Sequence, residues 1–262
     1  MNRNDPIGFF DSGLGGISVL QKTRQLLPGE DYLYYGDSRN APYGVRPAQE
    51  VEALTERAVT YLLGQGVKAI VLACNTATSA AAASLRSRYP QIPIIGTEPA
   101  LKPAVERHPG GRILVMATAM TLREQKFRVL WEQYRLQAEI IPVAGNGLVE
   151  LVEQGILEGP KAEQQLGQLL GPYLKCPVDA VVLGCTHYPF LRRPIRKIVG
   201  PDTEILDGAG GVARQLQRQL EGLELLQTRT TPGRVVFRNS AADPGLLELS
   251  KKLLAYCPKN RS

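Results

Sequence analysis

Two cysteines end apolar runs of nearly the same sequence. Residues 69–78 read AIVLACNTAT and residues 180–189 read AVVLGCTHYP, which puts Cys74 and Cys185 at equivalent places 111 positions apart. Each thiol follows a strand-like run and precedes a helix-like segment, and the positive end of a helix dipole lowers the pKa of a nearby thiol. A single buried cysteine is usually an inert core residue, but two equivalent ones indicate a shared role.

Two equivalent thiols suit a reaction that needs a group on each face of one carbon. A nucleophile needs only one thiol, and a redox pair needs its two sulfurs within bonding distance. In a two-base inversion, one group removes a proton and the other returns a proton from behind. The α-proton of an amino acid is a very weak acid, so such a site also needs positioned charge and hydrogen bonds away from water.

Polar residues that directly follow the two thiols can assist them. His187 lies two residues after the second cysteine, and we expect it to polarise that thiol or its proton. The other histidine, His108, looks like a surface residue. Asn75, Thr76 and Thr186 can donate hydrogen bonds to a thiolate or to a bound carboxylate.

The segment DSGLGG (11–16) follows the first strand-like run. It does not match the G-x-G-x-x-G fingerprint, and no P-loop motif occurs in the chain, so no nucleotide site is predicted. Its glycines form either a tight turn only or a loop whose N–H groups approach an anion at a helix N-terminus. Asp11 and Ser12 add a carboxylate, which could hold an ammonium group, and a hydroxyl.

Strand-like and helix-like segments alternate along the chain. The expected strands are 7–10, 31–38, 67–73, 92–96, 111–117, 138–144, 178–184, 203–208 and 234–240. Their unbroken apolar character predicts an α/β fold with parallel sheets covered on both faces. Ligands bind at the C-terminal ends of the strands in such sheets, which is where both cysteines and DSGLGG are expected.

The strand pattern restarts near residue 110. PIGFFDSG aligns with GRILVMAT at an offset near 106, and DYLYYGDS aligns with AEIIPVAG at an offset of about 107. We interpret this as two similar α/β units. The last strand and helix lie beyond the second cycle, so we expect them to return to the first unit. The predicted domains are residues 1–97 plus 208–262, and residues 98–207.

Composition and charge exclude several functional classes. The 262 residues are 44% hydrophobic and 21% charged, with no apolar run near the roughly 18 residues of a membrane span. The start, MNRNDPIGFF, lacks a signal peptide pattern, so we expect a cytoplasmic protein without a membrane partner. The net charge of +6 is widely spread and no nucleic-acid motif occurs, so nucleic acid is not an expected partner.

The cysteine pattern does not predict a metal site. No Cys-x-x-Cys occurs, and the lone pair Cys185-x-His187 is too small a set of ligands for zinc. The other two cysteines, Cys176 and Cys257, have no context that indicates chemistry.

A set of motifs occurs in a fixed order between about residues 7 and 208. They are IGFFDSGLGG, YGDSRNAPYG, ACNTAT, GTEPALKPA, ATAMT, GLVELVE and GCTHYPFL. Together they closely resemble the glutamate racemase family of the aspartate/glutamate racemase superfamily. The resemblance implies interconversion of L- and D-glutamate without a cofactor or metal, for peptidoglycan precursor synthesis. It also implies two flavodoxin-like domains with the active site in the cleft between them.

The resemblance assigns roles residue by residue. It implies that Cys74 acts on the D-enantiomer and Cys185 on the L-enantiomer. The implied catalytic set is Cys74, Cys185, Asp11, His187, Glu153 and Asp37. The implied substrate contacts are Asp11, Ser12, Tyr43, Gly44, Asn75, Thr76, Thr186 and His187, with Thr118 and Thr121 in a second tier.

Some points stay open at the level of sequence. Glu150 is close enough to Glu153 to compete for the acidic role, and Gly208 stands where the family usually has serine. An aspartate racemase, a non-catalytic amino-acid-binding protein and a DNA-linked regulatory role are the alternative functions. A homodimer is compatible with the family, whose dimer arrangement varies.

Overall fold

The structure is a computed structural model that describes residues 1–256, and these form two compact units. The first unit contains residues 1–97 and 209–255, and the second contains residues 98–208 together with Tyr256. Cys257 and the last residues of the predicted first domain lie outside the described residues.

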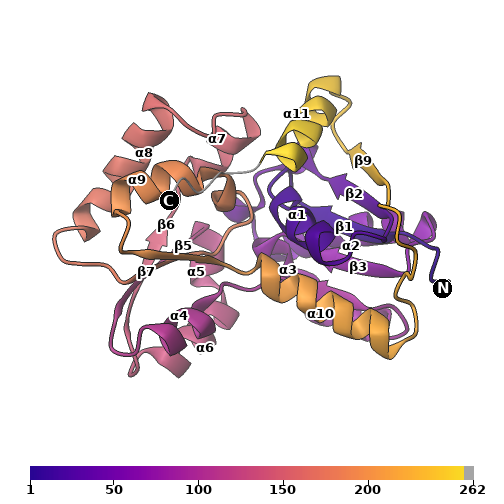
Figure 1. Cartoon of the computed structure of the whole chain (residues 1–262), viewed down its shortest axis with the longest axis horizontal. Coiled ribbons are helices and arrows are strands. Elements are labelled where there is room, and N and C mark those ends of the chain that lie inside the picture. Colours follow the sequence, from indigo (N-terminus) through magenta and orange to yellow (C-terminus); the bar gives the residue numbers. More distant parts are fainter. Residues whose placement is uncertain (257–262) are drawn as a thin grey trace. The chain divides into compact units, whose positions relative to one another are not determined.

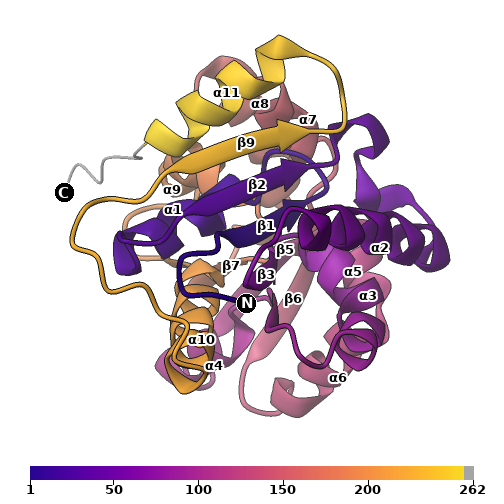
Figure 2. The same ribbon diagram turned by 90° about the vertical axis from the view of Figure 1, so that its right-hand side faces the viewer.

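The first unit contains one five-stranded parallel sheet (Figure 1). The strand order is β4-β3-β1-β2-β9, and Figure 2 shows β9, β2, β1 and β3 from top to bottom. The strands are β1 (Ile7–Asp11), β2 (Tyr32–Gly36), β3 (Ala69–Leu72), β4 (Ile94–Gly96) and β9 (Val235–Asn239). The helices are α1 (Ile17–Leu26), α2 (Ala48–Gly64), α3 (Asn75–Arg88), α10 (Ala209–Gly222) and α11 (Pro244–Ala255). Two 3-10 turns, η1 (Ser38–Asn40) and η2 (Tyr43–Val45), follow β2.

Two groups of helices cover the first sheet. The connection from β1 to β2 and the connection from β2 to β3 run in opposite directions along the sheet. Because such crossovers are right-handed, α1 and α2 lie on opposite faces. Helix α1 packs against α10 and α11, whereas α2 packs against α3. Both faces are therefore covered, as predicted for unbroken apolar strands.

The second unit contains a four-stranded parallel sheet in the order β6-β5-β7-β8. Its strands are β5 (Arg112–Ala117), β6 (Glu139–Ala144), β7 (Ala180–Leu183) and β8 (Glu204–Asp207). The helices are α4 (Leu101–Arg107), α5 (Ala119–Arg123), α6 (Gln125–Tyr134), α7 (Leu148–Glu153), α8 (Pro160–Leu170) and α9 (Arg192–Val199). Two 3-10 turns, η3 (Gly171–Tyr173) and η4 (Tyr188–Leu191), complete the unit. Apolar side chains of α4 and α6 form a core with those of β5 and β7.

The two sheets share one strand order. Strands β4-β3-β1-β2 of the first unit correspond to β8-β7-β5-β6 of the second, and every strand pair is parallel. This confirms the predicted parallel α/β fold with two similar units. The extra strand β9 pairs with β2, so the last described strand does return to the first sheet.

Three helical segments differ from the sequence prediction. The sequence TLREQKFRVLWEQY (121–134) predicts a single helix, but the structure has two helices there, because Glu124 is extended between α5 and α6. Helices α4 and α9 were not predicted. Each carries a proline at its third position, Pro103 and Pro194, and a proline in the first turn of a helix is tolerated although it resembles a helix breaker in the sequence.

Strand β6 lies at an edge of the second sheet. Within the described chain it pairs with β5 alone. The N–H groups of Glu139 and Gly145 bond to the carbonyls of Gly111, directly before β5, and Ala117, at its end. Because N–H groups alternate in direction along a strand, the N–H groups of even-numbered residues face the open edge. Position 142 on that edge is occupied by Pro142, which has no N–H.

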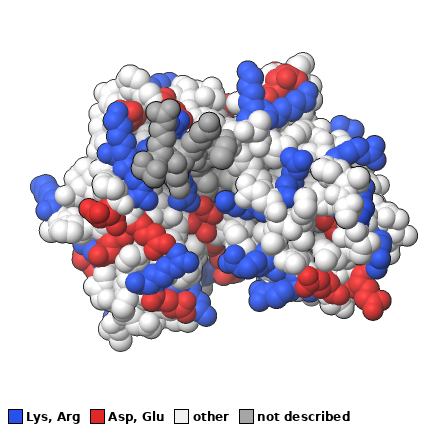
Figure 3. All heavy atoms as spheres, in the orientation of Figure 1, with Lys and Arg blue, Asp and Glu red and all other residues white. Residues whose placement is uncertain are grey.

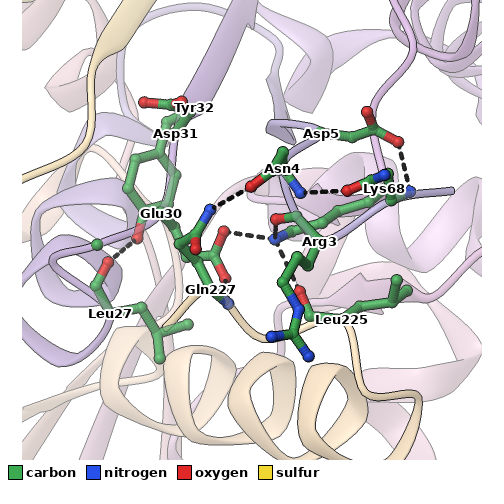
Figure 4. Close-up of polar contacts among 12 residues, drawn as sticks. Arg3, Asn4, Asp5, Leu27, Glu30, Asp31, Tyr32, Lys68, Leu225 and Gln227 are labelled. Atoms are coloured by element: carbon green, nitrogen blue, oxygen red, sulfur yellow. Dashed lines mark hydrogen bonds and ion pairs between the residues drawn. The ribbon is translucent and has the colours of Figure 1, made fainter. Parts of the chain in front are cut away.

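A buried ion pair lies at the start of β3, away from the cysteine end (Figure 4). Lys68 Nζ contacts Glu30 Oε2 at 2.6 Å, and the two side chains are 0% and 2% exposed. The same ammonium donates to the carbonyls of Arg3 at 2.7 Å and Leu225 at 2.9 Å. The pair thus joins the N-terminal segment, the loop before β2 and the segment after α10.

Charges of both signs are interspersed on the face shown in Figure 3. Helix α9 carries four basic residues, Arg192, Arg193, Arg196 and Lys197. Within it, Arg193 pairs with Glu158 and Lys197 pairs with Glu163. The positive charge of this helix is therefore balanced locally. Within residues 1–256, no helix has both the length and the apolar character needed to cross a membrane.

Candidate active site

Cys74 lies where β3 ends and α3 begins. The buried run Ala69–Leu72 delivers the chain to the C-terminal edge of the first sheet, and Cys74 is the N-cap of α3. Its Sγ accepts the N–H of Ala77 at 3.4 Å and lies 3.4 Å from the hydroxyl of Ser12. Donors of this kind stabilise a thiolate more than a thiol. This geometry agrees with the prediction of a thiol at a helix N-terminus.

Asp11 lies at the end of the neighbouring strand β1 and is fully buried. Its Oδ1 accepts the N–H of Gly13 at 2.9 Å. A Cβ at Gly16 would lie 2.7 Å from the Cβ of Asp11 and 2.8 Å from that of Ala73, so glycine is needed here. In DSGLGG, Gly16 therefore lets the start of α1 lie close to the ends of β1 and β3.

Asp37, after β2, is bound to the loop that follows it. Tyr43 donates its hydroxyl to Asp37 Oδ2 at 2.7 Å, and Asn40 Nδ2 lies 3.0 Å from each carboxylate oxygen. Burial raises the pKa of Tyr43, and the hydrogen bond to Asp37 raises it further. The carboxylate thus fixes η1 and η2, the second of which includes Gly44.

The first turn of α3 carries the other predicted contacts of this unit. Asn75 and Thr76 are buried, with exposures of 8% and 2%. The Oδ1 atom of Asn75 is buried without a hydrogen-bond partner among the described residues. A buried acceptor without a donor is costly, so such an atom at a strand end is typical of a ligand contact.

Cys185 follows β7 in the second unit, at the place that Cys74 takes after β3. Its Sγ lies 3.7 Å from Nδ1 of His187, and Nε2 of His187 lies 2.7 Å from Oε1 of Glu153 in α7. The thiol and the imidazole are buried, with exposures of 7% and 3%. Of the two acidic residues that competed at the level of sequence, it is Glu153 that bonds to His187.

The imidazole of His187 is held between two acidic groups. Burial lowers its pKa, but the hydrogen bonds and charges of Cys185 and Glu153 outweigh burial and raise the pKa well above its usual value of 6.5. These two acidic groups therefore favour the imidazolium form of His187. Its Nδ1–H can then donate to the Cys185 sulfur while its Nε2–H donates to Glu153.

The environment of the second thiol differs from the prediction in one respect. The segment after Cys185 is the 3-10 turn η4, and α9 begins only at Arg192. The helix N-terminus that contacts Cys74 therefore has no equivalent directly after Cys185.

The remaining predicted residues of the second unit lie at the same edge of its sheet. Thr118 caps α5, accepts the N–H of Thr121 at 3.2 Å and has its hydroxyl 2.9 Å from that of Thr121. Thr186 is buried beside the second thiol. Gly208 directly follows β8 and offers no hydroxyl.

One buried residue near the second thiol was missed by the sequence analysis. Tyr188 is fully buried and its hydroxyl donates to the carbonyl of Gly145 at 3.1 Å. Its place in GCTHYP, next to His187, was the only signal, and that signal does not distinguish a core tyrosine from a functional one.

Comparison with known proteins identifies the family. Residues 13–216 match the family described as Asp/Glu/hydantoin racemase. The chain belongs to this racemase family. It is similar to a glutamate racemase of Clostridium perfringens, with 49% identity over 96% of this chain and 97% of the relative. The resemblance found in the sequence is thereby confirmed.

Solved racemase structures have the same fold. A glutamate racemase of Bacillus anthracis matches with a TM-score of 0.87 and 30% identity, over 97% of this chain and 96% of that one. A glutamate racemase of Francisella tularensis, solved in complex with D-glutamate, matches with a TM-score of 0.82 and 26% identity, over 98% and 96% of the two chains.

The protonation of His187 in this racemase can be measured directly. We expect the His187 ring resonances to keep imidazolium chemical shifts through neutral pH, because its pKa is raised by Cys185 and Glu153. The stabilisation that comes with this charge is complete below the unfolded pKa of about 6.5 and is lost as the pH rises through the folded value. Glu153→Gln should lower the NMR titration midpoint.

The spectrum of His108→Gln identifies the ring resonances of His187, since the chain has only two histidines. A His187 midpoint at or below 6.5 in the folded protein would contradict the arrangement, as would a midpoint that Glu153→Gln leaves unchanged.

Proposed function

We propose that the chain is a glutamate racemase, an isomerase that interconverts L- and D-glutamate and supplies D-glutamate for peptidoglycan precursors. The observation that carries the proposal is the equivalence of Cys74 and Cys185, which end corresponding strands in two sheets of one strand order. Such a pair suits a reaction that is the same in both directions. The similarity to glutamate racemases over nearly the whole chain supports the substrate.

In the proposed mechanism the two thiols serve opposite faces of the α-carbon. One cysteine, as thiolate, removes the α-proton, and the other, as thiol, delivers a proton to the opposite face. The protonation states of the two thiols are thereby exchanged, and the enzyme is ready for the product enantiomer. Cys74 deprotonates D-glutamate and Cys185 deprotonates L-glutamate, in the assignment that the family resemblance implies.

The groups around Cys74 support a thiolate and an amino-acid ligand. Ser12 and the Ala77 N–H, each 3.4 Å from the sulfur, stabilise the thiolate. Asn75 Oδ1, which has no donor among the described residues, accepts a hydrogen from the substrate ammonium group in this proposal. Asp11 assists the first thiol, and Thr76 and Gly44 contribute further contacts to the substrate.

His187 supports the second thiol in the same proposal. As an imidazolium fixed by Glu153, it donates to the Cys185 thiolate and keeps it charged before proton abstraction. Thr186 contacts the substrate on this side. Asp37 has a positioning role rather than a proton-transfer role, since its carboxylate is engaged by Tyr43 and Asn40.

Three further properties belong to the proposal. The chemistry uses the protein's own side chains and takes no cofactor. The protein acts in the cytoplasm, where its product enters precursor synthesis. Homodimer formation is part of the proposal.

The test is proton exchange in heavy water. L- or D-glutamate is incubated with the purified protein and a chelator, without added cofactor, and α-deuteration and optical rotation are followed. We expect deuterium at the α-carbon together with formation of the opposite enantiomer. Binding of glutamate without exchange, by folded protein, would support the amino-acid-binding alternative, and exchange of aspartate in preference to glutamate would support an aspartate racemase.

A further inference from the structure

The loop between β7 and α9 carries the second thiol. It consists of residues 184–191, and its Cys185 and His187 are buried. A turn hydrogen bond joins the N–H of Tyr188 to the carbonyl of Cys185 at 3.1 Å, and α9 begins only at Arg192. The position of the thiol therefore depends on the groups that hold the two ends of this loop.

Both ends of the loop are held at the end of β8. At one end, Leu183 is the register partner of Asp207 in the pairing of β7 with β8. At the other end, the guanidinium of Arg192 donates to Asp207 Oδ2 at 2.5 Å and to the carbonyl of Ile205 at 2.7 Å. The Arg192 and Asp207 side chains are only 25% and 14% exposed. The Arg192–Asp207 pair thus closes the loop that carries the thiol.

The first unit closes the corresponding place in another way. The hydroxyl of Thr78, in the first turn of α3, donates to the carbonyl of Leu72 at 3.0 Å and accepts the N–H of Thr97 at 3.1 Å. Gly96 is the register partner of Leu72, and a Cβ there would lie 2.4 Å from Cγ2 of Thr78. Cys74 is therefore positioned by the helix that starts beside it and by a hydroxyl packed against a glycine.

The position that glycine fills in the first unit holds an aspartate in the second. Gly96 ends β4 and Asp207 ends β8, and these two strands take the same place in the two sheets. A guanidinium presents its donors in a rigid fork, so it can bind a carboxylate and a carbonyl together. In the second unit this fork takes over what the start of α3 does for Cys74.

We propose that Arg192, through its bonds to Asp207 and β8, is a positioning residue that holds Cys185 in the geometry that proton transfer requires. Arg192 acts through the loop, which connects it to the thiol over seven residues. A base that is displaced by about 1 Å can lose on the order of 100-fold in rate, even when the cause lies away from the chemistry. The inference rests on the proposed function in taking Cys185 as the base for L-glutamate.

The first measurement needs no substrate. Hydrogen–deuterium exchange with mass spectrometry follows the peptides that contain residues 184–191 and 73–78. In Arg192→Gln we expect faster exchange in the first peptide, because one end of its loop is released, and unchanged exchange in the second. Arg193→Gln is the matched control, since this neighbouring side chain pairs with Glu158 on the surface and should affect neither peptide.

The second measurement separates the two faces of the substrate. In a Cys74→Ser background, deuterium exchange into L-glutamate reports Cys185 alone, and in a Cys185→Ser background, exchange into D-glutamate reports Cys74 alone. Arg192→Gln should slow the first exchange by about 10- to 100-fold and leave the second unchanged. A general loss of stability would slow both, so this difference distinguishes positioning from a merely structural role.

Two milder variants cover the case in which Arg192→Gln does not fold. Arg192→Lys keeps the charge but not the fork, so it should recover part of the lost rate. Asp207→Asn keeps an acceptor oxygen and should slow the Cys185 exchange less than Arg192→Gln does. The effects of Arg192→Gln and Asp207→Asn should not add in the double variant, because each breaks the same pair.

The outcomes are distinct. An unchanged Cys185 exchange in the folded variants, equal losses at the two thiols, or unchanged hydrogen exchange over residues 184–191 would overturn the inference. Failure of the unaltered protein to exchange the α-proton of glutamate would instead overturn the proposed function, because the hydrogen-exchange measurement on the loop is independent of substrate.

Discussion

Replacement of either Cys74 or Cys185 with serine is expected to abolish racemisation, with a fall in kcat of at least about a thousandfold. A general acid or base contributes on the order of 100- to 10,000-fold, and a serine hydroxyl does not ionise in the range in which a thiol does. Each variant retains one base but has no group to deliver or remove the proton on the other face. Polarimetry with L- and with D-glutamate measures the loss.

Residual exchange should distinguish the two cysteine variants. Cys74→Ser retains the base for L-glutamate and should wash deuterium slowly into L-glutamate only, with retention. Cys185→Ser should do so only with D-glutamate. Cys176→Ser is the matched control, since this thiol is exposed and lies outside the proposed site. Near-normal turnover in either catalytic variant would exclude the two-base assignment.

Replacement of Lys68 with methionine is expected to destabilise the protein by about 3–5 kcal/mol, the usual cost of removing one partner of a buried ion pair. Glu30 would be left buried without its ammonium partner, and the carbonyls of Arg3 and Leu225 would lose a donor. Urea unfolding measures the change. Since Lys68 lies at the start of β3, opposite to Cys74, the folded variant should keep its kcat.

A surface pair provides the control for Lys68→Met. Lys251 and Glu248 are 63% and 62% exposed, so Lys251→Met should cost less than about 1 kcal/mol. In a double-mutant cycle, Lys68→Met combined with Glu30→Gln should be less destabilising than the sum of the single changes. Additive effects would mean that the ion pair contributes little coupling.

Much of the fold was predictable from sequence because apolar periodicity reports burial directly. Each of the two cysteines follows a strand that is an unbroken apolar run in the sequence. The repeat of the strand pattern then identified the two strands as equivalent. The hydrogen-bond partners within the site were harder to predict from the sequence. Glu150 and Glu153 lie one helical turn apart, so sequence alone did not decide which one bonds to His187, whereas the orientation of α7 does.

Other features depend on contacts between distant segments. Tyr188 and Gly145 are far apart in sequence, and only the parallel arrangement of β6, β5 and β7 brings their loops to one edge. The Oδ1 of Asn75 has no hydrogen-bond partner among residues 1–256, and the sequence could not predict this because it depends on which groups surround the atom in the fold. Helices α4 and α9 were not predicted for a local reason, because the proline in the first turn of each resembles a helix breaker in the sequence.

The open edge of β6 has a consequence for the behaviour of the protein at high concentration. In the first sheet the corresponding edge of β2 is covered by β9, whereas β6 presents its outward groups uncovered by any described strand. An uncovered strand can template pairing with another molecule and so start aggregation. Pro142 removes a donor from the middle of that edge. One residue thus protects the second sheet from intermolecular strand addition, a task that an entire strand performs in the first.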